Sequence, residues 1–367
     1  MKGIYEDTLV LTRRGYVCAK EVSDTDIVLG LDNMFHQVES IERIEYSGSA
    51  ISMRGMSVDS FICLPDTEII TKERYLKYNP VSKHMNRAFK KESSLICASS
   101  INRDYFPGLL INMNDTLPVW NGTEYNQYGH HRILDKLSDK FTNPHFWYIM
   151  GRYVGDGWQR KNYQSGGSYR GGIVICCVDK DIDSLIEAIE KCRYTYTKTK
   201  ERTTYRVSIY SIELYEFVER YGHGASGKTI DIDTLNIPTE LLKEFIHGYL
   251  DSDGAFTQGK YKLTTTSKYL AYSLGQALMK TYYTHYHIYF IERPKKYIIE
   301  GREVNQRDWY QVVWDTSREK TYKAFYENED IWFPLKEIKH IDVSNMTFYH
   351  IKTVGDFGYN AYSIGTK

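Results

Sequence analysis

Two nine-residue segments of this chain repeat one another, and each ends in an acid followed by glycine. The segments span residues 149–157 and 246–254, and alignment without gaps matches Gly151 with Gly248, Asp156 with Asp253, and Gly157 with Gly254, besides the isoleucine that begins each segment. Asp251 has no acidic counterpart, because the first segment has Val154 at the matching position. The internal comparison therefore selects Asp156 and Asp253 over the other carboxylates nearby.

The spacing of small residues in the repeat predicts two helices that pack closely. Gly151 and Gly155 are four positions apart, as are Gly248 and Ser252, so each pair shares one face of a helix. Faces of this kind let two helix backbones approach one another. Each helix would end at its own Asp-Gly, with the glycine in the left-handed cap conformation. Two carboxylates would then lie side by side at the ends of the helix pair.

Adjacent carboxylates repel one another unless cations lie between them, and Mg²⁺ is the expected occupant of such a site. Two metal ions held in this way suit in-line displacement at a phosphodiester. The alternative is that both segments are buried core helices with an acidic C-cap. One copy alone would favour that alternative, whereas two copies that match at the small residues and at the acid favour the metal site.

These residues resemble the LAGLIDADG family of homing endonucleases, in its two-motif, single-chain form, over roughly residues 144–330. The resemblance implies that Asp156 and Asp253 bind divalent ions, each acid serving one DNA strand, with Mg²⁺ as the cofactor and Mn²⁺ as a substitute. Gly155 and Ser252, which precede the acids, are predicted to belong to the same metal site. Arg152 and His247 depart from the family, which is often apolar at their motif positions.

The family also uses a basic residue near each acid to polarise the attacking water. Lys228 matches one such place and Lys336 is the candidate for the other, so both are predicted to be catalytic. The alternative for either lysine is a solvated side chain without a role. The glycine-rich segment before Lys228 does not have the spacing of a P-loop.

Periodicity predicts an α+β fold with two αββαββα halves, and the resemblance implies that these halves form a pseudo-twofold saddle. The first half is expected to continue from its motif helix with strands at 158–163 and 172–178, a helix at 182–192, strands at 194–198 and 204–209, and a helix at 212–221. The second half is expected to have a helix at 239–250, strands within 255–265, a helix at 267–283, strands at 285–291, 297–299 and 309–313, and a helix at 317–327.

Basic residues gather locally although the net charge is zero, with 47 basic and 47 acidic residues. Strand alternation is expected to place arginines and lysines of the hairpins on one sheet face, where they would contact double-stranded DNA. The alternative for each basic run is a solvated face. The predicted DNA-binding residues are Lys72, Arg74, Lys77, Lys83, Arg87, Lys90 and Lys91 in one run, Lys198, Lys200, Arg202 and Arg206 in the first half, and Arg293, Lys295, Lys296, Arg302 and Arg307 in the second half.

The flanking segments show an all-β pattern of short alternating strands and tight turns. Segments 7–12, 24–32 and 64–67, with 347–356 near the C-terminus, resemble the Hint fold of inteins. At the position of that family's splicing nucleophile this chain has Gly3. At the threonine and histidine of the family's Thr-x-x-His motif it has Leu64 and Thr67, so no imidazole is available there for acid–base catalysis. The prediction is a splicing-inactive Hint-like domain, which serves as a DNA-binding extension or is a structural remnant.

The predicted domains are a Hint-like part at 1–74, an inserted DNA-recognition region at 75–143, a LAGLIDADG endonuclease domain at 144–334 and a Hint-like C-terminal part at 335–367. The chain has no run of eighteen apolar residues, no signal-peptide pattern and no CxxC pair among six cysteines, so a reduced, cytoplasmic protein is expected. We also expect a monomer, in a bacterial or phage-infected cell. The expected function is site-specific cleavage of both strands of a long, asymmetric DNA site. The alternatives are a non-cleaving DNA-binding regulator and an RNA maturase.

Overall fold

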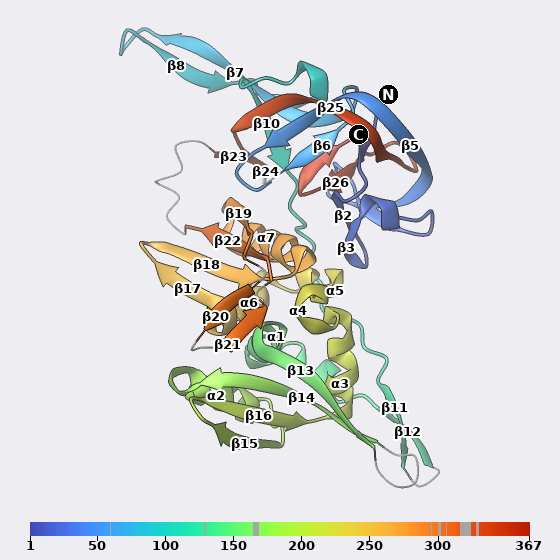
Figure 1. Ribbon diagram of the computed structural model, residues 1–367, viewed down its shortest axis with the longest axis vertical. Helices are drawn as coiled ribbons and strands as arrows, with labels where there is room; N and C mark the ends of the chain where they lie inside the picture. The colour runs from blue at the N-terminus through green and yellow to red at the C-terminus, as the bar shows by residue number, and fades with distance from the viewer. Residues whose placement is uncertain are drawn as a thin grey trace. The chain divides into compact units, whose positions relative to one another are not determined.

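The computed structural model describes residues 1–58, 60–127, 130–163, 169–294, 296–299, 302–305, 307–315, 324–327 and 330–367. The chain divides into two compact units (Figure 1). The all-β unit comprises residues 1–113, 282–289 and 314–367, and the α/β unit comprises residues 114–281 and 290–313. These limits differ from the boundaries predicted after residues 74, 143 and 334. No described helix is both long and apolar enough to cross a membrane.

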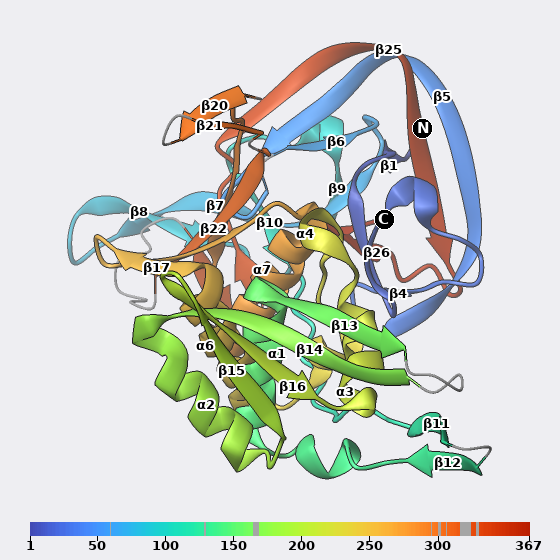
Figure 2. The same cartoon turned by 60° about the horizontal axis from the view of Figure 1, so that its bottom comes forward.

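The first half of the α/β unit has the predicted order of helices and strands. Its sheet is antiparallel with the strand order β13-β14-β16-β15, and Figure 2 shows this sheet lying in front of α1. Ile173 and Ile175 are two positions apart on β14, so their side chains point to the same face of the sheet. Both are fully buried, because this face packs on the helices. The elements are α1 (Pro144–Asp156), β13 (Gly157–Tyr163), β14 (Tyr169–Val178), α2 (Ile182–Lys191), β15 (Tyr196–Glu201), β16 (Thr204–Tyr210) and α3 (Ile212–Phe217).

The second half repeats this order up to its fourth sheet strand. Its sheet has the strand order β17-β18-β22-β19, and a separate two-stranded hairpin, β20–β21, lies in sequence between β19 and β22. The elements are α6 (Thr239–Asp253), β17 (Gly254–Thr257), β18 (Lys260–Thr265), α7 (Lys268–Tyr282), β19 (Tyr286–Ile291), β20 (Lys296–Ile299), β21 (Arg302–Asn305) and β22 (Trp309–Trp314).

The helix predicted at 317–327 is wrong over its last three residues, and residues 317–323 lie outside the described residues. Phe325–Glu327 form strand β23, which pairs with β24 (Asp330–Trp332) in the sheet of the all-β unit. The Phe325 ring lies 4.0 Å from that of Phe89, between centroids. Strand pairing with β24 and packing of this half-buried aromatic side chain within the all-β unit override the helical pattern.

The link between the two halves contains two short helices that the sequence did not predict. A 3₁₀ turn at Val218–Tyr221 ends at Gly222, whose φ is +74°. The helices α4 (Gly224–Gly227) and α5 (Ile232–Asn236) follow. They are too short to show a periodic apolar face in the sequence.

The all-β unit joins the N-terminal and C-terminal segments of the chain. β5 (Phe35–Arg54) pairs with β25 (Glu337–Thr353) along most of its length, and β1 (Ile4–Tyr5) pairs with β25. Its remaining strands are β2 (Leu9–Thr12), β3 (Gly15–Cys18), β4 (Ile27–Leu29), β6 (Phe61–Cys63), β7 (Glu68–Asn79), β8 (His84–Phe89), β9 (Ser94–Cys97), β10 (Tyr105–Leu109), β26 (Tyr359–Ala361) and β27 (Ile364–Thr366). Assignment of this unit to the Hint fold stays a prediction.

The region predicted as one insertion at 75–143 is divided between the two units. β7 continues to Asn79, and β10 pairs with both β7 and β27, so residues up to 113 belong to the all-β unit. The rest of the region contributes the hairpin β11–β12 (Thr123–Gln127 and His130–Leu134) to the α/β unit. The prediction failed because strand pairing with the distant C-terminus leaves no local signal.

Candidate active site

The helices α1 and α6 pack with their backbones in contact at the predicted glycines. A Cβ atom added to Gly151 would lie 1.9 Å from the carbonyl oxygen of Phe245. A Cβ atom added to Gly248 would lie 2.1 Å from the carbonyl oxygen of Tyr148. These separations leave no room for any side chain, so glycine at both positions sets the distance between the helices.

Both helices end at the duplicated acids and lead directly into strands. Gly157 and Gly254 have φ values of −103° and −113°, so the predicted left-handed cap conformation is wrong. Glycine is needed here for space instead. A Cβ atom at Gly157 would lie 2.6 Å from the carbonyl oxygen of Tyr153, and one at Gly254 would lie 2.4 Å from that of Leu250.

The two acids lie beside one another in the α/β unit. The Asp253 carboxylate oxygen Oδ2 is 3.7 Å from the position of a Cβ atom on Gly155, the residue before Asp156. Burial raises the pKa of Asp156. Burial, and secondly the charge of Asp156, raise the pKa of Asp253 to about 6. Within the part of the chain that the structure describes, no donor hydrogen-bonds to either carboxylate. The pair is therefore a partly buried concentration of negative charge.

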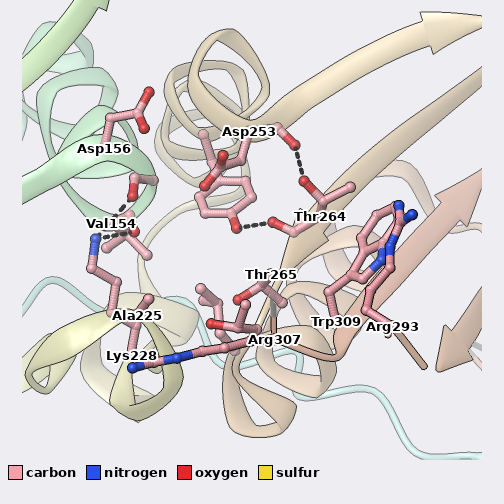
Figure 3. A pocket seen from close by; sticks show the side chains of 14 residues that line it. Val154, Asp156, Ala225, Lys228, Asp253, Thr264, Thr265, Arg293, Arg307 and Trp309 are labelled. Atoms are coloured by element: carbon pink, nitrogen blue, oxygen red, sulfur yellow. Dashed lines mark hydrogen bonds between the residues drawn. The ribbon is translucent and has the colours of Figure 1, made fainter. Parts of the chain in front are cut away.

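A cavity of about 490 Å³ opens at the acids, within the α/β unit. Figure 3 shows Asp156 and Asp253 at the ends of neighbouring helices, with basic and aromatic side chains around the same cavity. Its charged and aromatic lining residues are Asp156, Asp253, Lys228, Arg293, Arg307, Trp309 and Tyr249. The site therefore combines acids that can hold cations with cations that can hold a phosphate.

Lys228 lies at this site and caps the C-terminal end of α1. Its Nζ donates to the carbonyl oxygens of Val154 at 2.7 Å, Gly155 at 2.9 Å, Gly157 at 3.1 Å and Tyr153 at 3.2 Å. Burial lowers the pKa of Lys228 to about 8, although Asp253 and Asp156 oppose this shift. The lysine thus supplies positive charge where the helix dipole is negative and two acids lie nearby.

Lys336, the second lysine predicted to be catalytic, lies elsewhere in the chain. It belongs to the all-β unit, and its backbone N–H donates to the Arg54 carbonyl oxygen at 2.8 Å. It is not among the described residues that line the cavity. In the second half, the exposed basic residues of the lining are Arg293 and Arg307.

Arg152 is a residue of this site whose position the sequence analysis marked only as a departure from the family. Its side chain is 1% exposed, and its Nε and Nη1 atoms have no hydrogen-bond partner among the described residues. Burial raises the pKa of Asp156, and the positive charge of Arg152 opposes this rise. The signal in the sequence was a charged residue within an otherwise apolar or small helix face.

The basic residues of the first sheet do not share one face, contrary to the prediction. Lys198 pairs with Val207, which is fully buried, so Lys198 and Lys200 point to the side of the sheet that carries the helices. Arg206 points to the opposite side, where its guanidinium lies 5.6 Å from the Trp158 ring centroid. Arg202 lies exposed in the turn between β15 and β16. The error is one of register, because adjacent strand positions face opposite sides.

In the second half, Arg293 is exposed and its guanidinium lies 5.4 Å from the Trp309 ring centroid. Arg307 is exposed beside the same cavity, and Lys296 is exposed on β20. Lys295 and the side chain of Arg302 lie outside the described residues. Each half therefore presents one arginine stacked on a tryptophan.

Lys72 is wrong as a DNA-binding residue, because its side chain is only 4% exposed and pairs with the Glu327 carboxylate. Arg74 pairs with Asp104 at 2.6 Å. The rest of the run is exposed on the β7–β8 hairpin or just after it, and Figure 1 shows this hairpin extending away from the other strands of its unit. These exposed residues are Lys77, Lys83, Arg87, Lys90 and Lys91.

No family model and no curated protein matches this chain. Its structural neighbours are LAGLIDADG proteins. The crystal structure of I-DmoI in complex with DNA and Ca has 15% identity and a TM-score of 0.35, over 46% of this chain and 82% of that chain. The N-terminal LAGLIDADG domain of DUF199/WhiA has 9% identity and a TM-score of 0.30, over 47% and 75%. The homing endonuclease I-WcaI bound to its DNA recognition sequence has 12% identity and a TM-score of 0.29, over 46% and 75%. The functional assignment therefore rests on the residues of this chain.

Proposed function

We propose that this protein is a site-specific DNA endonuclease of the LAGLIDADG type, which hydrolyses both strands of double-stranded DNA in a metal-dependent reaction. The observation that supports the proposal most strongly is the pairing of Asp156 and Asp253 at the ends of two packed helices. Nothing in the packing of an ordinary core requires two partly buried carboxylates side by side, since such a pair is costly without a cation.

The residues at the acids fit a divalent cation. The described residues contain no group of three or more His, Cys, Asp and Glu side chains that could hold a metal. Two carboxylates from Asp156 and Asp253, with the backbone oxygen of Ser252 and that of Gly155, which also accepts a hydrogen bond from Lys228, would leave further positions to water and phosphate, as Mg²⁺ prefers. A bound divalent ion would stabilise negative charge on the phosphate and make water a stronger nucleophile. Mg²⁺ is the proposed ion, with Mn²⁺ as a substitute.

The other residues of the site would bind and orient the DNA. Arg293 and Arg307 lie beside the acids and can pair with phosphate oxygens. Stacking of Arg206 on Trp158 and of Arg293 on Trp309 restricts each guanidinium, and a guanidinium can bond a guanine edge in the major groove. The two halves share this arginine–tryptophan pair but differ in their other basic residues, so an asymmetric DNA site is proposed. A monomer is sufficient, because one chain supplies both acids.

The all-β unit is proposed to be a splicing-inactive extension that contacts DNA through the β7–β8 hairpin. The Thr67 hydroxyl, in the segment that resembles the Hint active site, hydrogen-bonds to the backbone of Gly3, at 2.9 Å from its nitrogen and 3.0 Å from its oxygen. Neither residue offers a nucleophile for splicing, since one lacks a side chain and the hydroxyl of the other is bound to the backbone. Lys77 and Arg87 on the hairpin are exposed and available to phosphates.

Cleavage of a plasmid library with Mg²⁺ tests the proposal. The wild-type chain should linearise plasmids that carry its site, and sequencing of the cut ends gives the target. D156N and D253N should each reduce double-strand cleavage by about two orders of magnitude or more, since each acid serves one strand.

D251N is the matched control, because Asp251 is an exposed acid on the same helix without a counterpart in the repeat, and it should cut like the wild type. Double-strand cleavage at the wild-type rate by D156N or D253N would contradict the assigned role. Specific DNA binding without cleavage by the wild type would point to a regulator, and RNA binding without cleavage to a maturase.

A further inference from the structure

Arg152 is a buried charge, and two of its nitrogens have no hydrogen-bond partner in the described part of the structure. Its side chain is 1% exposed, and both Nε and Nη1 are shielded from solvent without a hydrogen bond. An arginine remains charged in proteins and has five N–H donors to satisfy. A guanidinium left in this state is costly, so a compensating interaction with nearby negative charge is required.

The charge of Arg152 acts on both acids, because burial raises the pKa of Asp156 and of Asp253 and this charge opposes the rise. Arg152 lies four residues before Asp156, one helical turn away on the same face of α1. Its backbone is held against α6, because the Ser252 hydroxyl donates to the Arg152 carbonyl oxygen at 3.3 Å. A Cβ atom on Gly248 would lie 3.0 Å from the Arg152 nitrogen. The backbone of Arg152 is therefore held at the contact between the two helices that carry Asp156 and Asp253.

The matching position of the second helix is not charged. Tyr249 stands there, 1% exposed, and its hydroxyl donates to the Thr264 carbonyl oxygen at 2.7 Å. The Tyr249 hydroxyl thus has a hydrogen bond, whereas two nitrogens of Arg152 have none in the described structure. At these two matching positions the helix pair therefore has a fixed positive charge in α1 and none in α6.

We propose that Arg152 is a positioning residue, whose buried charge stabilises the Asp156 and Asp253 carboxylates before cations bind and then competes with those cations. This inference rests on the proposed metal-dependent function. The guanidinium and an incoming divalent cation are attracted to the same carboxylates and repel one another. Arg152 thereby sets the metal concentration at which the site fills, without contacting DNA.

The test measures binding of Mn²⁺ to the full chain without DNA, by titration calorimetry and by the loss of the electron paramagnetic resonance signal of free Mn²⁺. R152M removes the charge at similar volume and should lower the Kd for Mn²⁺ by about tenfold. R152K keeps the charge and should remain within about twofold of the wild type. K243M removes a charge from the outer part of α6, about 15 Å from Asp253 along the helix, and should leave the Kd unchanged.

An unchanged or weaker Mn²⁺ affinity in R152M would overturn the inference, as would equal effects of R152M and R152K. If R152M does not fold, the thermal unfolding midpoint of the double variant R152M/D156N is measured, to see whether removal of the acid restores folding. Recovery of folding in the double variant supports the charge pairing, and failure to recover contradicts it. Wild-type protein that binds no Mn²⁺, or binds it equally well as D156N/D253N, would refute the proposed function and this inference together. Wild-type binding with no effect of R152M refutes only the inference.

Discussion

At the scale of single residues, the repeat identified the acids but not their surroundings. Asp156 and Asp253 were predictable because two copies of one pattern agree at that position, and the glycines needed for close packing agree as well. Arg152 was not predictable as a buried charge, since its exposure depends on how α1 faces α6. The prediction that Lys72 binds DNA failed for the same reason, because the exposure of a side chain depends on how the elements pack. A lysine within a basic run looks solvated in the sequence, yet its partner Glu327 is contributed by a distant strand.

Lys228 should contribute to stability through the carbonyl groups that it caps. K228M removes the donor to four backbone oxygens at the end of α1, so the free energy of unfolding should fall by about 1–3 kcal/mol. Urea denaturation of wild type and variant measures this loss. K243M, at a half-buried lysine that pairs with the exposed Glu240, should change the midpoint little. Equal midpoints for K228M and the wild type would argue against the capping role.

At the scale of elements, the order of helices and strands in the α/β unit followed from the sequence, because alternation and amphipathic periodicity are strong there. Along α2, Ile182, Leu185 and Ile189 recur at helical spacing and are all buried. The face of a strand residue was less predictable. A shift of one position moves a lysine from the open side of the sheet to the helix side, and the burial of Val207, which pairs with Lys198, shows which side β15 presents.

The contact between α1 and α6 should tolerate no side chain at its closest point. G151A introduces a methyl group 1.9 Å from the Phe245 carbonyl oxygen, which forces the helices apart and should cost about 3 kcal/mol or more. Thermal or urea unfolding measures this effect. G227A is the matched control, because a Cβ atom there would have no atom within 4 Å, and it should leave stability nearly unchanged. A G151A variant as stable as the wild type would contradict the close contact between α1 and α6 at Gly151.

At the scale of the whole molecule, the joining of both chain ends in one all-β unit was expected from the resemblance of both segments to the Hint fold. The limits of that unit were not predictable. Leu109 of β10 pairs with Ile364 of β27, and a pairing across so much sequence leaves no mark on either segment. The hairpin β11–β12 shows the opposite case, since it is local but lacks strong alternation of apolar residues.

The all-β unit should lose stability in mild acid because of His285. Burial lowers the pKa of His285 to about 4, and its Nδ1 lies 2.8 Å from the Tyr326 hydroxyl. The unfolded chain binds a proton near pH 6.5 whereas the folded chain does not, so the free energy of unfolding falls as the pH drops from about 6.5 to about 4. The loss approaches about 3 kcal/mol at the lower end of that window.

Unfolding measured at several pH values checks this expectation. H285Q cannot take up the proton, so its stability should depend less steeply on pH between 4 and 6.5 than that of the wild type. H247Q, at an exposed histidine of the α/β unit, is the matched control and should keep the wild-type slope. Parallel pH curves for H285Q and the wild type would exclude His285 as the source.

The pairing of β5 with β25 has a consequence for synthesis of the chain. β5 leaves the ribosome early, whereas β25 follows only after the whole of residues 114–281. Until then the long strand β5 has a free edge, which is a template for wrong pairing between nascent chains. The α/β unit must therefore fold while its neighbour is still incomplete, and the time needed to translate it is the period during which this protein is most prone to aggregate.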